Sequence, residues 1–140
     1  MKLIKIESVY MSKRRNRIMG LIGLSVLILL GVGLYLAHKN HEFQNEMFRI
    51  VHSKEVKNLI EKKLKKLDPH ALTDKGKIRS YKIDDKTIRH NPMGGIMFHI
   101  VINENQDIIG KFGIQKYGED EPISTVGMSK SKKFQDLLKE

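Results

Sequence analysis

Cysteine is absent from the 140 residues of the chain. Its absence excludes a disulfide framework, a lipid-modified cysteine anchor and any metal or nucleophile site built on a thiol. The sequence also lacks internal repeats and low-complexity tracts, which are the patterns of solenoids and flexible linkers. One folded domain is therefore expected outside the apolar segment described below.

The side-chain patterns of common catalytic and metal sites are incomplete. His41-Glu42 lacks the second histidine of a zinc-binding helix, because Asn45 stands at that position. Ser129 and Lys132 match the pattern S-x-x-K, but the companion motifs S-D-N and K-T-G do not follow. The six histidines are scattered singly. We therefore expect no enzyme, no cofactor and no bound metal.

Charge is missing from one long stretch, residues 18–37, with the sequence IMGLIGLSVLILLGVGLYLA. As a helix, about 20 residues span about 30 Å, which is the thickness of the hydrocarbon core of a bilayer. A core helix of a soluble protein needs polar residues on one side, and this stretch has almost none. The segment predicts a transmembrane anchor.

Basic residues gather directly before this segment. Residues 1–17 hold six of them against the single acid Glu7: Lys2, Lys5, Lys13, Arg14, Arg15 and Arg17. By the positive-inside rule, residues 1–17 form a cytoplasmic tail and residues 38–140 an extracytoplasmic domain at the cell membrane. Met11 begins the string MSKRRNR, so Met1 and Met11 both suit an initiating residue.

A cleaved signal peptide is the alternative to an anchor, because both begin with a basic region followed by an apolar one. The apolar part of a signal peptide is usually shorter and ends in a small-x-small cleavage site. Here Ala37 has Tyr35 in place of the small residue that cleavage requires. We expect an uncleaved, single-pass anchor with its N-terminus inside.

The net charge of +10 suggests nucleic acid as a partner at first sight. Half of this charge lies in the basic tail, where the positive-inside rule explains it as a determinant of membrane orientation. The remainder is expected to face away from the cytoplasm. We therefore expect no nucleic-acid partner.

A helical repeat of apolar residues follows the anchor, with spacings of three and four and a change of phase near His52 and Ser53. Its members are Phe43, Met47, Ile50, Val51, Val56, Leu59, Ile60, Leu64 and Leu67. The pattern predicts one long amphipathic helix, or two short helices meeting at Ser53 as an N-cap. Asp68-Pro69 ends it.

Four lysines crowd the last turns of this predicted helix: Lys62, Lys63, Lys65 and Lys66. They suit a contact with anionic lipid headgroups or wall polymers. The alternative is a solvated face that compensates the negative end of the helix dipole.

After residue 76 the apolar period changes to two, which predicts strands. Tyr81 and Ile83 alternate, Asp84-Asp85 predicts a turn, and a short run follows at residues 87–90. The clearest alternation runs from Ile96 to Ile102 and is answered, after the polar residues 103–107, by a second run from Ile108 to Ile114. These two runs predict a hairpin.

A last helix is expected at residues 131–139, where Phe134, Leu137 and Leu138 would reach the core. The predicted fold class is α+β: a transmembrane helix, then an amphipathic helix packed on an antiparallel β meander, with a short C-terminal helix. His99 is expected on the outward face of its strand.

One loop between predicted strands has an unusual composition: His90-Asn91-Pro92-Met93-Gly94-Gly95. Pro92 favours extended backbone at Asn91, and Gly94-Gly95 allows a positive φ and close approach of another backbone. The loop is a candidate recognition site in which His90, Asn91 and Met93 supply contacts. A plain β-turn is the alternative.

The segment LKKLDPHALTDKGKIRSYKIDDKTIRHNPMGGI, with the closing GMSKSKKFQDLLKE, resembles the family called domain of unknown function 1310. The resemblance covers about residues 41–140 and implies a Gram-positive source with an N-terminal hydrophobic segment. It implies no activity and assigns no site residue.

Together these features predict a membrane-anchored binding or interaction domain of the Gram-positive cell envelope, with an envelope protein, a peptide or an anionic wall polymer as its partner. The alternative is an immunity-type or signalling protein that responds to a membrane-active peptide.

Overall fold

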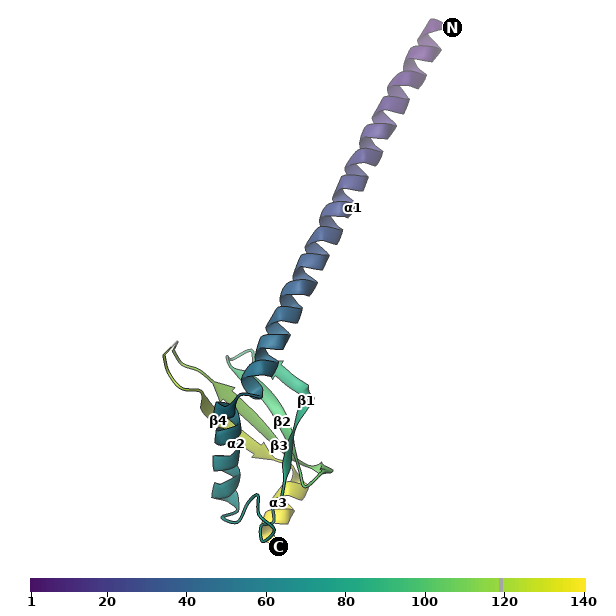
Figure 1. The fold of residues 1–140 in the computed structure, drawn as a ribbon. Helices are drawn as coiled ribbons and strands as arrows, with labels where there is room; N and C mark the ends of the chain where they lie inside the picture. Colours follow the sequence, from purple (N-terminus) through teal and green to yellow (C-terminus); the bar gives the residue numbers. More distant parts are fainter. Residues whose placement is uncertain (119) are drawn as a thin grey trace. The chain divides into compact units, whose positions relative to one another are not determined.

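The computed structural model describes residues 1–118 and 120–140, in which two helices precede four strands and a last helix (Figure 1). The elements are, in order, α1 (Lys2–Val51), α2 (Lys54–Leu67), β1 (Tyr81–His90), β2 (Ile96–Ile102), β3 (Asn105–Gln115), β4 (Ser124–Lys130) and α3 (Lys132–Lys139). The chain divides into two compact units, Met1–Glu42 and Phe43–Glu140. The fold class is α+β, as the sequence predicts.

The first unit is the greater part of α1. Among the described residues, α1 is the helix that is long and apolar enough to cross a membrane, by length and composition, and none of its most apolar window is buried. The hydroxyl of Ser25 donates a hydrogen bond of 2.8 Å to the carbonyl of Ile22, so the polar side chain within the apolar segment is satisfied by its own helix.

The second unit begins with the end of α1 and with α2, and the break between them at Ser53 is the one that the two-helix alternative predicts. The first of the two helices is not short, because α1 continues from the apolar segment without interruption. Ser53 has extended backbone, and its hydroxyl accepts a hydrogen bond from the N–H of Val56, as an N-cap does. Met47 and Val51 from the end of α1 are buried, together with Val56, Ile60 and Leu64 of α2. Most of the apolar stripe seen in the sequence therefore packs inward, whereas Phe43 is 43% exposed and Leu59 is half-buried outside the core.

The four strands form one antiparallel sheet in the order β1-β2-β3-β4. Phe98 of β2 lies opposite Phe112 of β3, and Ile96 lies opposite Ile114, so the alternating residues of both strands share one face. The sequence predicts this hairpin and the meander correctly. Strand β4, which pairs with β3 from Gly110↔Lys130 to Gln115↔Ser124, has no counterpart in the sequence prediction.

Two details of the predicted strands are wrong. Asp84-Asp85 is no turn between separate runs but lies within β1, where the register with β2 shifts between Asp84 and Arg89. The β2–β3 connection has two residues instead of five, because Asn103 and Glu104 both adopt positive φ, 51° and 58°. Two successive positive φ values are typical of the tight type I′ turn.

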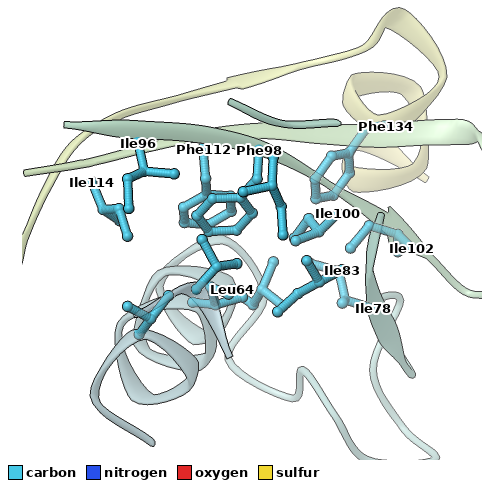
Figure 2. Close-up of a cluster of buried hydrophobic side chains, with 14 of the residues drawn as sticks. Leu64, Ile78, Ile83, Ile96, Phe98, Ile100, Ile102, Phe112, Ile114 and Phe134 are labelled. Atoms are coloured by element: carbon cyan, nitrogen blue, oxygen red, sulfur yellow. The ribbon is translucent and has the colours of Figure 1, made fainter. Parts of the chain in front are cut away.

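The core lies between the inner face of the sheet and the helices (Figure 2). The rings of Phe98 and Phe112 stack with centroids 5.8 Å apart. Leu64 approaches them from α2, and Phe134 closes the core from α3. Phe134 is 0% exposed. The Ser131 hydroxyl caps α3 by accepting a hydrogen bond from the N–H of Phe134. The predicted C-terminal helix is confirmed.

Candidate binding groove and basic face

The loop at residues 90–95 is a compact turn that joins β1 to β2. The N–H of Asn91 donates to the Gly95 carbonyl at 3.0 Å, and the N–H of Gly94 donates to the Asn91 carbonyl at 2.8 Å. The Asn91 side-chain oxygen accepts a further hydrogen bond from the N–H of Met93 at 3.1 Å. Asn91 therefore uses its polar groups to hold the turn.

The two glycines of this loop are required by its backbone. Gly94 and Gly95 have φ values of 98° and 85°, which side-chain-bearing residues rarely adopt. A Cβ atom on Gly95 would lie 2.2 Å from the carbonyl oxygen of Ile114. The turn packs directly on the end of β3.

The remaining side chains of the loop point to different surroundings. Met93 is 89% exposed. The His90 ring instead packs on Phe43, with centroids 5.6 Å apart and an angle of 60° between the rings. Two of the predicted site residues, His90 and Gly95, line a groove that extends beyond the loop. The other three are Asn91, Met93 and Gly94.

This groove, with a volume of about 720 Å³, lies within the second unit. It is bounded by residues 43–55 of the two helices, by the ends of β1, β2 and β3 and by the β3–β4 connection. Its apolar lining consists of Phe43, Met47, Ile50, Ile96, Ile114, Pro122 and Ile123. The volume is in the range of about 300–1,000 Å³ that is usual for ligand sites.

Polar side chains of the groove are mostly carboxylates. Acidic residues in the lining are Glu46, Glu55, Asp120 and Glu121, whereas Lys116 is its one lysine or arginine among the described residues. The N–H of Ile123 donates to the Glu55 Oε1 at 2.7 Å, which ties the β3–β4 connection to the start of α2. One wall of the groove is thereby fixed to a helix.

Three of the four lysines of the predicted basic face lie together in the structure. Lys62, Lys65 and Lys66 surround a shallow hollow on α2 together with Asn58 and Glu61. Lys63 does not line this hollow and is half-buried.

Glu61 beside these lysines is already engaged. Its Oε1 accepts a hydrogen bond of 3.3 Å from the Tyr81 hydroxyl. Burial, followed by the negative charge of Glu61, raises the pKa of Tyr81 to about 12. The tyrosine therefore stays neutral and acts as a hydrogen-bond donor between α2 and β1.

The outward face of the sheet carries His99, as the alternation predicts. Burial and the positive charges of Lys111 and Arg89 lower the pKa of His99, so its neutral form is favoured at neutral pH. In the described part of the chain, no group of three or more His, Asp or Glu side chains is arranged to hold a metal ion.

Sequence reasoning missed the groove. Phe43, Ile96 and Ile123 belong to three separate segments, and each reads locally as an ordinary core position. The one local signal is the change of sign at residues 119–121, Glu-Asp-Glu, in a chain with a net charge of +10.

A family model described as "Protein of unknown function (DUF1310)" matches residues 18–137. No curated protein and no solved structure matches the chain. The matched range includes the apolar segment together with the folded unit.

Proposed function

The chain belongs to the DUF1310 family of proteins of unknown function, and we propose that it is a membrane-anchored binding protein whose C-terminal unit lies outside the cytoplasm. The groove between the helices and the end of the sheet is its binding surface. We further propose the cell envelope of a Gram-positive bacterium as the setting, on the basis of the family resemblance.

The groove is the observation that carries this proposal. The groove combines a volume of about 720 Å³ with a mostly apolar lining. Phe43 stays 43% exposed at the groove, although its neighbours Met47 and Ile96 are buried. An exposed aromatic ring beside a preformed apolar lining is typical of a ligand site.

Anchoring and orientation are supported by the first unit. Residues 18–37 carry no charge and are all exposed within their helix, so in water they would lack any apolar partner. The basic residues precede this stretch, as they do in helices whose N-terminus remains in the cytoplasm.

We propose binding rather than catalysis because two titratable side chains of the groove, His90 and Glu55, already make structural contacts. Its polar groups are carboxylates and Lys116, and its histidine, His90, packs on Phe43. The Glu55 carboxylate is already used to accept the N–H of Ile123.

The orientation is tested by labelling single cysteines, since the native chain has none. Ser12→Cys reports on the tail and Lys139→Cys on the folded unit, and both residues are exposed. A membrane-impermeant maleimide should label Lys139→Cys in intact cells and Ser12→Cys only after lysis. The reverse pattern would overturn the orientation.

The groove is tested by a photoreactive amino acid placed at position 123 or at position 126 in the full chain. Ile123 lines the groove, whereas Val126 is 53% exposed and lies beside Gly113 on the outward face of the sheet. Irradiated cells should give a discrete adduct from position 123 alone. Equal adducts from both positions, or from position 126 only, would contradict a binding role for the groove.

A further inference from the structure

We propose that the occupant of the groove is a short cationic peptide with aliphatic side chains. This inference rests on the proposed binding function and adds the chemistry of the partner. It depends on the contrast between the charge of the groove and the charge of the whole protein.

The chain is strongly basic, with 26 lysines and arginines against 16 acids. The groove has the opposite balance, because four carboxylates line it with a single lysine. Glu46 and Glu121 are exposed at its edge. Glu46 comes from α1 and Glu121 from the β3–β4 connection, so acids from distant parts of the sequence border one hollow.

This arrangement selects among possible ligands. Anionic wall polymers and lipid headgroups would be repelled by the carboxylates, and they fit the face formed by Lys62, Lys65 and Lys66 better. A single metal ion would need several carboxylates in one place, and the described residues form no such group. Separated carboxylates around an apolar lining instead match a ligand with several spaced positive charges.

The lining specifies the rest of the ligand. Ile50 and Ile123 are half-buried and Phe43 is half-exposed at the groove, so a ligand would cover apolar surface there. Aliphatic side chains are stabilised by such burial. A peptide that alternates aliphatic and basic residues offers both features on opposite sides of an extended backbone.

The test uses the full chain in micelles of an uncharged detergent. The probes are three short capped peptides in which leucine alternates with lysine, glutamine or glutamate. Methyl NMR signals of Ile96, Ile114 and Ile123 locate the bound peptide, and titration gives its Kd. At low salt, the lysine peptide should bind at the groove about tenfold more tightly than the glutamine peptide and show a steep loss of affinity at about 0.5 M salt.

A charge variant tests which carboxylates act. Glu46→Gln with Glu121→Gln keeps the shape of both side chains, and it should weaken binding of the lysine peptide about three- to tenfold without changing the Kd of the glutamine peptide. The matched control is Glu104→Gln with Asp136→Asn, because these exposed acids lie outside the groove. The control should bind like the native chain.

The outcomes separate the two proposals. If all three peptides shift the groove methyls with equal Kd, the groove binds ligands but the cationic preference is wrong. If the charge variant and its control weaken binding equally, the assignment of Glu46 and Glu121 is wrong. If none of the peptides shifts the groove methyls, the inference of a cationic peptide is wrong, and the adduct at position 123 decides separately whether the groove binds another ligand.

Discussion

Replacing Gly95 by alanine tests whether the loop at residues 90–95 needs a positive φ at this position and packs closely on the end of β3. The φ of 85° at this position costs an L-residue about 1–2 kcal/mol. The new Cβ would also lie 2.2 Å from the Ile114 carbonyl oxygen, so the β1–β2 turn or the end of β3 must shift. We expect the free energy of unfolding to fall by about 2–4 kcal/mol in total.

Two other glycines provide graded controls. Gly94 has a φ of 98°, but a Cβ there would meet only the flexible Gln115 side chain, at 3.1 Å. Gly94→Ala should therefore cost about 1–2 kcal/mol. Gly127 in β4 has no positive φ, and a Cβ added to it would have nothing within 4 Å, so Gly127→Ala should change stability by less than about 0.5 kcal/mol.

The assay is urea unfolding of a fragment of residues 41–140, followed by circular dichroism. The expected order of stability is native and Gly127→Ala together, then Gly94→Ala, then Gly95→Ala. If Gly95→Ala were as stable as Gly127→Ala, the close contact between the loop and β3 would be refuted. Met93→Ala should leave stability unchanged, because its side chain is 89% exposed.

Three further predictions concern the core, the pH dependence and the membrane orientation. Phe98→Ala should lower the free energy of unfolding by about 3–5 kcal/mol, because its ring is 0% exposed and stacks on Phe112; a loss below about 1 kcal/mol in the same urea assay would show that the ring is not in the core. Asp68→Asn should destabilise the fragment by about 1–3 kcal/mol at pH 7, because the carboxylate accepts hydrogen bonds from the N–H groups of His70, Lys77 and Ile78. The hydrogen bond from Ile78, with those from His70 and Lys77, lowers the pKa of Asp68 from 3.8 in the folded state. The stabilisation by the Asp68 carboxylate is therefore present above about pH 4 and is lost as the pH falls through the lowered pKa. A stability gap between native and Asp68→Asn that stays constant from pH 7 to pH 2 would contradict this reasoning. Replacing Arg14, Arg15 and Arg17 with Glu should reduce or invert the outward placement of the folded unit, and unchanged protease access in protoplasts would count against the basic tail as its determinant.

The sequence was sufficient for those elements whose side chains carry a strong period. The alternation from Ile96 to Ile102 and the stripe of Val56, Ile60 and Leu64 each name the face that the structure buries. Ser53 was identifiable as an N-cap because a serine oxygen can satisfy an N–H three residues later. Local chemistry decides these features, so a single sequence reveals them.

Strand β4 was not predictable in this way. Its sequence, STVGMSK, has no buried residue, so no alternation of apolar residues marks it. Pairing with β3 makes it a strand, and that pairing depends on the tertiary fold. The irregular part of β1 was misread for a related reason, since a run of polar residues signals a turn and a bulge alike.

The candidate sites show the same division. The unusual glycines of the loop were visible in the sequence, but their contact with Ile114 was not. The four lysines were visible as a cluster, yet helix geometry places Lys62, Lys65 and Lys66 on one hollow and Lys63 outside it. The groove required the folded structure, because its walls come from α1, α2 and the β3–β4 connection.

Protection of a single cysteine in the groove tests the central claim most directly. In intact cells that produce the full chain, an impermeant maleimide should label both Ile123→Cys and Val126→Cys, since both positions would lie outside the membrane. Adding the leucine–lysine peptide should slow labelling at position 123 and leave position 126 unchanged. Labelling of neither site before lysis, or equal slowing at both sites, would contradict an outward-facing groove that binds a cationic peptide.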